Sequence, residues 1–306
     1  MRAVLFPGQG SQYVGMGSDF YNKFDIVKKI FEKVDKTLGF SLTKIILDGP
    51  DSELKLTQNT QPAIMTVGVS IFTVLKNNFN LKLNESRFFA GHSLGEYTAL
   101  VCAESLSIER AAYLLHERGK SMQAAVSPDD GAMMAVLGMR LDEVEKEINL
   151  LPKGEICEIA NDNSNEQVVV SGKKNAIKIL NENLKKKKKR GIILPVSAPF
   201  HCSLMKNAAE NMKEKIENTT FLKPKPNIIS NVTAKEETDV NKIKPLLIDQ
   251  ITSRVRWRES VDYMIKQGVV NFLEIGPGKV LSGLVKKINK DVKISNIKNL
   301  EDIKND

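Results

Sequence analysis

The segment from residue 88 to residue 103 constrains the fold most strongly, because it places a serine between two glycines where a strand meets a helix. Residues 88–90 are a short apolar run typical of a strand, and residues 94–103 follow a helical pattern. Residues 91–95 read Gly-His-Ser-Leu-Gly, which fits G-x-S-x-G. Glycine removes the Cβ atoms that would clash in so sharp a turn. We therefore predict a strand, a tight turn that exposes Ser93, and a helix whose first N–H groups face that hydroxyl.

A serine hydroxyl needs a base within hydrogen-bond reach to act as a nucleophile at neutral pH, and that base is most often histidine. The chain has three histidines. The side chain of His92 leaves the turn in a different direction from Ser93, and His116 lies about 200° round a predicted helix from Arg118. His201 follows a segment with two prolines, which indicates a rigid loop. We expect His201 to be the base.

An arginine lies on the apolar side of the predicted helix 108–125. The apolar stripe of this helix consists of Ile108, Ala111, Leu115 and Met122, and Arg118 falls on it. A buried guanidinium without a partner is strongly unfavourable, so we expect an anion to meet it. That anion is either an acidic side chain, such as Glu96 or Glu104, or the carboxylate of a substrate held by two parallel N–H···O bonds.

Five motifs together resemble the malonyl-CoA:acyl carrier protein transacylase family over about residues 2–288. They are residues 6–12 (Phe-Pro-Gly-Gln-Gly-Ser-Gln), residues 91–96, Arg118 with Met122-Gln123, residues 198–201 (Ala-Pro-Phe-His) and residues 274–278 (Glu-Ile-Gly-Pro-Gly). The resemblance implies transfer of a malonyl group from malonyl-CoA to the phosphopantetheine thiol of an acidic holo-acyl carrier protein, for fatty acid biosynthesis.

The resemblance also implies roles for the residues at the matching positions. Ser93 corresponds to the nucleophile, His201 to the base and Arg118 to the residue that binds the malonyl carboxylate. The main-chain carbonyl of Gln250 corresponds to the group that orients the histidine.

Four further positions are implied to surround the reacting thioester. The backbone N–H groups of Gln9 and Leu94 would form the oxyanion hole, and Met122 and Phe200 would line the acyl pocket. In related acyltransferase domains the residue before the catalytic histidine tends to be phenylalanine for malonyl substrates and serine for methylmalonyl substrates. Phe200 therefore predicts a preference for malonyl over methylmalonyl of roughly ten- to two-hundredfold.

Helices and short apolar strands alternate along the chain, which predicts a hydrolase-like three-layer α/β core with a largely parallel sheet. Within residues 127–197 the order changes to strand 132–137, helix 141–151, two strands around a turn at 161–166, helix 175–188 and strand 191–196. This order is typical of a ferredoxin-like subdomain. We predict that it is inserted into a core made of residues 1–126 and 198–306, with the active site in the cleft between the two.

No cofactor, metal or membrane is expected. The loop Gly8-Gln9-Gly10 begins like a dinucleotide fingerprint, but Tyr13 takes the place of its third glycine, and residues 276–279 lack phosphate-loop spacing. The three cysteines show no C-x-x-C pairing and indicate a reducing compartment rather than disulfides or a zinc site. No apolar stretch approaches about 20 residues and no export signal precedes the first strand, so we expect a cytoplasmic protein.

The formal net charge is +8, and residues 185–190 are all Lys or Arg. No aromatic residues interleave this run and no nucleic-acid-binding motif appears, so we interpret it as the solvated end of a helix. A basic surface would instead accelerate the encounter with an acidic carrier protein. We expect a monomer.

Two alternatives share some of these features. A serine hydrolase or thioesterase would also use Ser93 and His201, with an acidic residue between them in the chain. Its candidates are Asp129, Asp130, Asp142 and Asp162. A non-catalytic adaptor for carrier proteins would keep the fold but lose the nucleophile or the base, which this chain retains.

Overall fold

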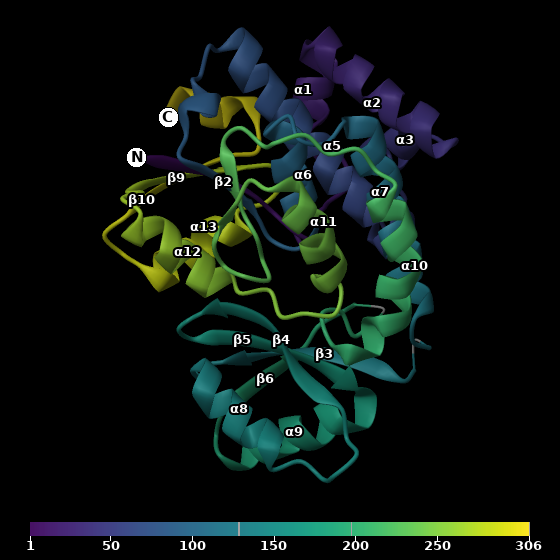
Figure 1. Ribbon diagram of the computed structural model, residues 1–306, viewed down its shortest axis with the longest axis vertical. Helices are drawn as coiled ribbons and strands as arrows, with labels where there is room; N and C mark the ends of the chain where they lie inside the picture. Colours follow the sequence, from purple (N-terminus) through teal and green to yellow (C-terminus); the bar gives the residue numbers. More distant parts are fainter. Residues whose placement is uncertain (128, 197, 306) are drawn as a thin grey trace.

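The first strand, β1 (Arg2–Phe6), lies in the middle of a six-stranded sheet with the order β10-β9-β1-β2-β7-β8. Neighbouring strands are parallel except for the short edge strand β8, which pairs antiparallel with β7. In the computed structural model, which describes residues 1–127, 129–196 and 198–305, this sheet belongs to the upper lobe (Figure 1). The remaining strands are β2 (Phe88–Gly91), β7 (Asn227–Ile229), β8 (Glu236–Glu237), β9 (Asn271–Ile275) and β10 (Lys293–Ile297).

Helices cover both faces of this sheet because its strands are apolar on both sides. Val4 and Phe6 face one buried cluster, whereas Ala3 and Leu5 face another. The first cluster includes side chains of α1 (Ser18–Lys23), α2 (Asp25–Leu38), α3 (Leu42–Leu47), α4 (Asp51–Lys55), α5 (Thr57–Asn78), α6 (Leu94–Cys102), α7 (Ile108–Ala124), α10 (Lys206–Glu217) and α11 (Val240–Asp249). The second is covered by α12 (Trp257–Lys266) and α13 (Val280–Ile288). The predicted three-layer α/β core is confirmed.

A four-stranded antiparallel sheet with the order β4-β5-β3-β6 forms the lower lobe in Figure 1. Its elements follow the chain as β3 (Gly131–Leu137), α8 (Leu141–Asn149), β4 (Cys157–Ser164), β5 (Gln167–Lys173), α9 (Lys174–Lys186) and β6 (Arg190–Ile193). This β-α-β-β-α-β order is the predicted ferredoxin-like arrangement. Ser197, the last residue of the predicted insertion, lies outside the described residues, and the limits 127–197 stay a prediction.

Several predicted elements end at other residues in the structure. β6 ends at Ile193 rather than at residue 196, because Pro195 has no N–H to donate to a ladder. α9 ends at Lys186 rather than at residue 188, where Lys188 takes a left-handed φ of 56°. α8 ends at Asn149, and β4 continues to residue 164, so the turn between β4 and β5 is shorter than predicted.

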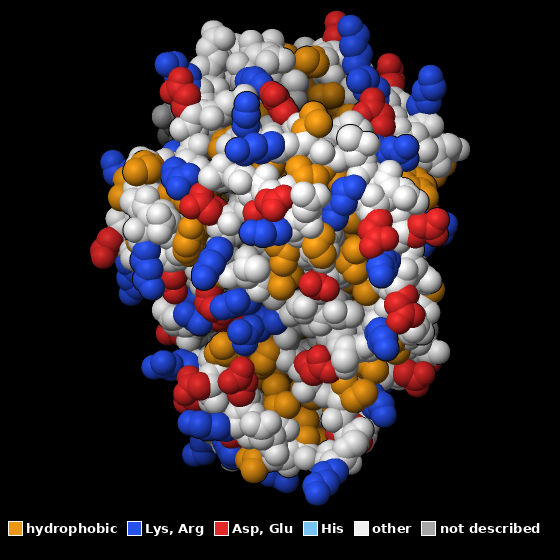
Figure 2. Space-filling model, viewed as in Figure 1, with side chains coloured by type: hydrophobic (Ala, Val, Ile, Leu, Met, Phe, Trp, Pro, Cys, Tyr) orange, Lys and Arg blue, Asp and Glu red, His pale blue; other side chains and the backbone are white. Residues whose placement is uncertain are grey.

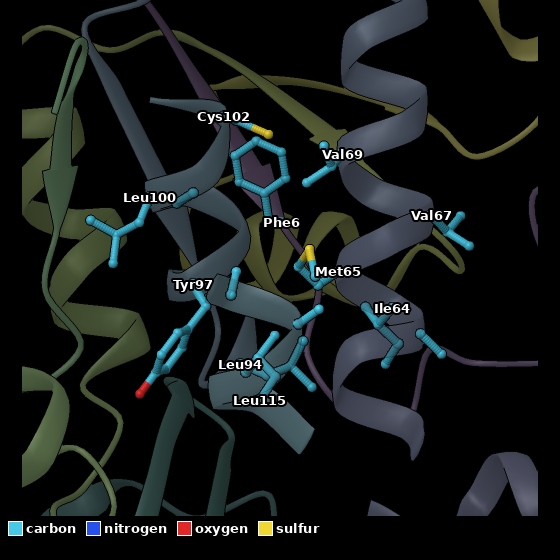
Figure 3. Close-up of a cluster of buried hydrophobic side chains, with 14 of the residues drawn as sticks. Phe6, Ile64, Met65, Val67, Val69, Leu94, Tyr97, Leu100, Cys102 and Leu115 are labelled. Atoms are coloured by element: carbon cyan, nitrogen blue, oxygen red, sulfur yellow. The ribbon is translucent and has the colours of Figure 1, made fainter. Parts of the chain in front are cut away.

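The turn between β2 and α6 has the sharp geometry expected of a nucleophile elbow. Ser93 has φ 55° and ψ −112°, outside the regions that L-residues ordinarily occupy. A Cβ atom on Gly91 would lie 1.9 Å from the carbonyl carbon of Gly95, and one on Gly95 would lie 2.3 Å from the backbone oxygen of Phe6. Figure 3 shows Phe6 between α6 and α5, with Leu94 and Tyr97 of α6 in the same buried cluster. Packing against β1 therefore fixes the position of the turn.

The charged run lies in the lower lobe, away from the core sheet, whereas Cys102 belongs to the buried cluster on that sheet. The run occupies the last turn of α9 and the start of β6, where Lys187 forms an ion pair with Glu147 at 2.6 Å. Cys102, Cys157 and Cys202 are buried and free. Within the described part of the chain, no helix has the length and apolar character needed to cross a membrane.

Gly95→Ala should lower the free energy of unfolding by about 1–3 kcal/mol, because the new methyl group would overlap backbone that cannot rotate aside. Gly283→Ala in α13 is the matched control, since nothing lies within 4 Å of its added Cβ, and it should stabilise the helix by up to about 1 kcal/mol. Urea unfolding of both variants measures the difference. Equal effects would contradict the close packing of the elbow against β1.

Candidate active site

A cavity of about 480 Å³, called here the inner pocket, lies between the two lobes and contains the elbow. The upper lobe contributes Ser93, Arg118 and His201 to its wall, and the lower lobe contributes Met133 and Asn161. The other lining residues are Gln9, Gly10, Gln12, Lys55, Gln61, His92, Leu94, Met122, Leu194, Pro195, Val196 and Phe200.

Ser93 and His201 face each other in this pocket. Ser93 Oγ lies 2.8 Å from His201 Nε2, which is hydrogen-bond distance for proton transfer. His201 Nδ1 lies 2.8 Å from the backbone oxygen of Gln250. A carbonyl only accepts, so this contact requires the proton on Nδ1 and leaves Nε2 free to accept the proton of the serine.

The surroundings of His201 keep its imidazole neutral. The residue is 4% exposed. Burial and the nearby Arg118 guanidinium lower the pKa of His201 to about 3, although the hydrogen bond to Gln250 opposes this shift. At neutral pH the imidazole is therefore in the form that can act as a base.

Arg118 is buried beside the serine, with 1% of its surface exposed. Its Nη1 donates to Gln61 Oε1 at 2.7 Å, and its Nη2 donates to Gln250 Oε1 at 2.8 Å and to Ser93 Oγ at 3.2 Å. All three acceptors are neutral, and no ion pair of the described residues involves this guanidinium. Its Nε has no hydrogen-bond partner there either. The cation therefore keeps capacity for an anion that enters the pocket.

Neither acidic side chain proposed from the sequence pairs directly with Arg118. Glu104 lies at the surface and pairs with Lys76. Glu96 is buried one helical turn after Ser93, and its Oε2 accepts from Gln250 Nε2 at 2.7 Å and from the backbone N–H of Asn231 at 3.0 Å. Burial raises the pKa of Glu96 to about 7, and these hydrogen bonds with the Arg118 charge limit the rise. Glu96 thus acts on the site through Gln250 and Asn231.

The other predicted site residues border the inner pocket from several elements. Leu94 is the first residue of α6, so its N–H has no acceptor within the helix. Gln9 lies in the loop after β1, which contacts the elbow so closely that a Cβ on Gly8 would lie 2.6 Å from the backbone oxygen of His92. Met122 and Phe200 line the same cavity.

Residues that an alternative mechanism would use lie elsewhere. His116 contacts the backbone oxygen of Gln58 at 2.9 Å and does not line the inner pocket. Asp162 is buried in an ion pair with Arg258 at 2.8 Å rather than against His201. Asp129 and Asp142 pair with lysines at the surface. In a hydrolase the histidine would donate its Nδ1 hydrogen bond to an acidic side chain, whereas here the acceptor is the backbone carbonyl of Gln250.

Three polar side chains of the site were not found from the sequence. Gln61 holds Arg118, Asn231 Oδ1 accepts from the backbone N–H of Ser93 at 2.7 Å, and Asn163 Oδ1 lies 2.9 Å from His92 Nε2. Each comes from a different part of the chain, and no spacing relates it to the elbow. Within the described residues, no group of His, Cys, Asp and Glu side chains could hold a metal ion.

Comparison with known proteins agrees with this geometry. Residues 4–303 match the family model described as an acyl transferase domain. The chain is 42% identical over 293 residues to the malonyl CoA-acyl carrier protein transacylase of Bacillus subtilis, which covers 95% of this chain and 91% of that protein. The chain belongs to this acyltransferase family.

Solved structures of the family superpose over nearly the whole chain. An acyl-carrier-protein S-malonyltransferase from Bartonella henselae has a TM-score of 0.96 and 41% identity, over 99% of this chain and 97% of that one. A malonyl-transacylase solved in complex with a type II PKS acyl-carrier protein has a TM-score of 0.95 and 36% identity, over 99% and 97% of the two chains. The family resemblance predicted from five motifs is therefore confirmed.

The pKa of Glu96 predicts a pH dependence of stability that Glu96→Gln removes. In the unfolded chain this carboxyl ionises near its ordinary value of 4.5, whereas in the folded protein it stays protonated up to about 7. Folding stability should therefore fall as pH rises between these values, by on the order of 3 kcal/mol. Gln250 Nε2 and the backbone N–H of Asn231 both donate to Oε2 of Glu96, so the side-chain oxygen of a glutamine at this position can accept both hydrogen bonds.

Urea unfolding of the wild type and Glu96→Gln at about pH 5 and about pH 8 measures this effect. The variant should gain stability relative to the wild type at the higher pH. Glu104→Gln, which removes a carboxylate from the surface, is the matched control. Parallel curves for wild type and Glu96→Gln would show that the buried carboxyl does not titrate in this range.

Proposed function

We propose that the protein transfers the malonyl group of malonyl-CoA to the phosphopantetheine thiol of acyl carrier protein through an acyl-enzyme on Ser93, for fatty acid biosynthesis. The relatives named above carry this activity in their names. The observation that carries the proposal is the buried Arg118, which lies 3.2 Å from the Ser93 hydroxyl and has only neutral acceptors. A planar guanidinium beside the nucleophile suits an acyl group that ends in a carboxylate.

In the first half-reaction His201 Nε2 takes the proton of Ser93 as the hydroxyl attacks the thioester carbonyl of malonyl-CoA. The backbone N–H groups of Gln9 and Leu94 stabilise the negative charge on the carbonyl oxygen. When the C–S bond breaks, His201 gives its proton to the coenzyme A sulfur. The products are malonyl-Ser93 and coenzyme A.

The second half-reaction runs the same steps with the carrier protein as acceptor. His201 takes the proton of the phosphopantetheine thiol, whose sulfur attacks the serine ester. The ester C–O bond then breaks, and His201 returns the proton to Ser93 Oγ. The mechanism is ping-pong, and Gln250 supports both halves because its carbonyl holds the imidazole in one tautomer.

Phe200 and Met122 are proposed to shape the space around the malonyl group. Phe200 directly precedes the base and borders the inner pocket, where Met122 lies on the same helix as Arg118. The α-methyl group of a methylmalonyl substrate would need space that the Phe200 ring fills. The preference for malonyl over methylmalonyl substrates stays a prediction.

The partner implied by the family is an acidic carrier protein, which the net charge of +8 would attract. Figure 2 shows Lys and Arg side chains on both lobes of one face, with Asp and Glu among them. On this face the basic side chains are therefore spread over both lobes. The monomeric state, the cytoplasmic location and the absence of nucleic-acid binding stay predictions.

Ser93→Ala should abolish both the covalent adduct and malonyl transfer, because it removes the hydroxyl that lies 2.8 Å from His201 Nε2. Intact mass after mixing with malonyl-CoA detects the adduct, and carrier-protein loading measures transfer. The wild type should accumulate malonyl-enzyme until holo-acyl carrier protein is added. Rapid release of free malonate by the wild type would instead indicate a thioesterase.

Arg118→Ala should lower kcat/KM for malonyl-CoA, with a loss of about 2–5 kcal/mol of transition-state stabilisation. The loss with acetyl-CoA should be smaller, because acetyl has no carboxylate. Arg118→Lys should restore little, since the two-pronged geometry is lost. Arg110→Ala, at an exposed position on the same helix, is the matched control. Equal losses for both acyl-CoAs would assign Arg118 a purely structural role.

A further inference from the structure

His201 has a left-handed backbone, which is uncommon for a residue other than glycine. Its φ is 59°. Such a conformation is unfavourable and persists where several surrounding contacts fix it. Because the imidazole leaves the chain from this backbone, the contacts that hold the turn around His201 also set the approach of Nε2 to Ser93 Oγ.

Packing leaves space beside this turn. His201 borders the inner pocket and also a second cavity of about 480 Å³, called here the rear cavity. Residues of α8 and β4 from the lower lobe, with Thr252 and Arg254 from the upper lobe, form the rest of its wall. A group that borders a space has no packing partner on that side. Hydrogen bonds must therefore limit the movement of the turn there.

A carboxylate of the lower lobe holds the chain two residues after His201. Glu158 lies on β4, and its Oε2 accepts from the backbone N–H of Ser203 at 3.0 Å. Its Oε1 accepts from the Ser203 hydroxyl. Two hydrogen bonds to one residue restrain both its position and its orientation, and bonds to a carboxylate are stronger than those between neutral groups. Glu158 borders the rear cavity and does not line the inner pocket.

A second contact from the lower lobe supports the same turn. The buried Ser171 hydroxyl on β5 donates to Cys202 Sγ at 3.6 Å, and that thiol donates to the backbone oxygen of Pro199 at 3.1 Å. The thiol thereby joins the two sides of the turn that contains His201. The upper-lobe contact between His201 Nδ1 and Gln250 acts on the ring rather than on this backbone.

We propose that Glu158 is a positioning residue for the base, which couples the lower lobe to proton transfer at Ser93. The proposal rests on the proposed function, in which His201 takes the proton of Ser93. Glu158 lies outside the inner pocket and acts only through Ser203 and the turn. Its removal should therefore slow the chemical step and leave the binding of malonyl-CoA unchanged.

Glu158→Ala tests this assignment, with acylation of Ser93 followed by rapid quenching and intact mass at several malonyl-CoA concentrations. The maximal acylation rate should fall about three- to tenfold, while the half-saturating concentration stays the same. Glu158→Gln should recover most of the rate, since its amide can accept from the Ser203 N–H and donate to the Ser203 hydroxyl. Ser203→Ala removes only the hydroxyl and should lower the same rate by a smaller factor.

A His201→Ala background separates positioning of the base from a merely structural role. In that background Glu158→Ala should leave the residual acylation rate unchanged, because the group that it positions is absent. Glu182→Ala, at an exposed position of α9 in the same lobe, is the matched control and should change the rate in neither background.

An unchanged maximal rate for Glu158→Ala, an equal fold loss in the His201→Ala background, or a loss that Glu158→Gln does not recover would each overturn the assignment. A sulfonyl fluoride, which modifies an activated serine and carries neither malonyl nor pantetheine, keeps the two proposals apart. A wild type that reacts with it at Ser93 but forms no malonyl-Ser93 would overturn the proposed function. The sulfonylation rates of the same variants would then test Glu158.

Discussion

Gln250, at the end of α11, contacts three parts of the active site at once. Its backbone oxygen holds the Nδ1 side of His201, its side-chain oxygen accepts from Arg118, and its Nε2 donates to Glu96. The base and the cation are thereby positioned by a single residue. The helix is in turn fixed to the core by Ile243 and Leu247, which are buried. A shift of α11 would change the orientation of the base and of the cation together.

The charges of the site are balanced through neutral groups rather than by direct pairing. Arg118 is buried against glutamine and serine oxygens, and the carboxyl of Glu96 is linked to it through Gln250. If a protein carboxylate contacted Arg118 directly, the carboxylate of a substrate would have to compete with it for the guanidinium. With neutral partners the guanidinium is held in place, and its charge remains available at the serine. The same charge helps to keep His201 neutral until it accepts a proton.

The predictions from sequence succeeded where the physical cause is local. The elbow is specified by glycines that must lack side chains at two close backbone approaches, and each of those glycines lies two positions from Ser93 in the chain. The helical period placed Arg118 on the buried face of α7, where it lies. The strand and helix order of the lower lobe also followed from local patterns, although β6 and α9 end earlier than predicted. Pro195 ends β6, and the left-handed backbone of Lys188 ends α9.

The sequence by itself determined the two layers of helices around a parallel sheet, the second lobe, the elbow and the buried position of the arginine, because periodicity and glycine placement act over neighbouring residues. Only the tertiary structure decided which polar groups meet there. Gln61, Asn231 and Asn163 come from separate elements, and an amide side chain gives no periodic signal that distinguishes a site residue from a surface one. The choice of Gln250 and Asn231 as partners of Glu96, in place of Arg118, depends on distances between α6, α11 and the loop after β7. Such distances exist only once the sheet has brought the ends of its parallel strands to one edge.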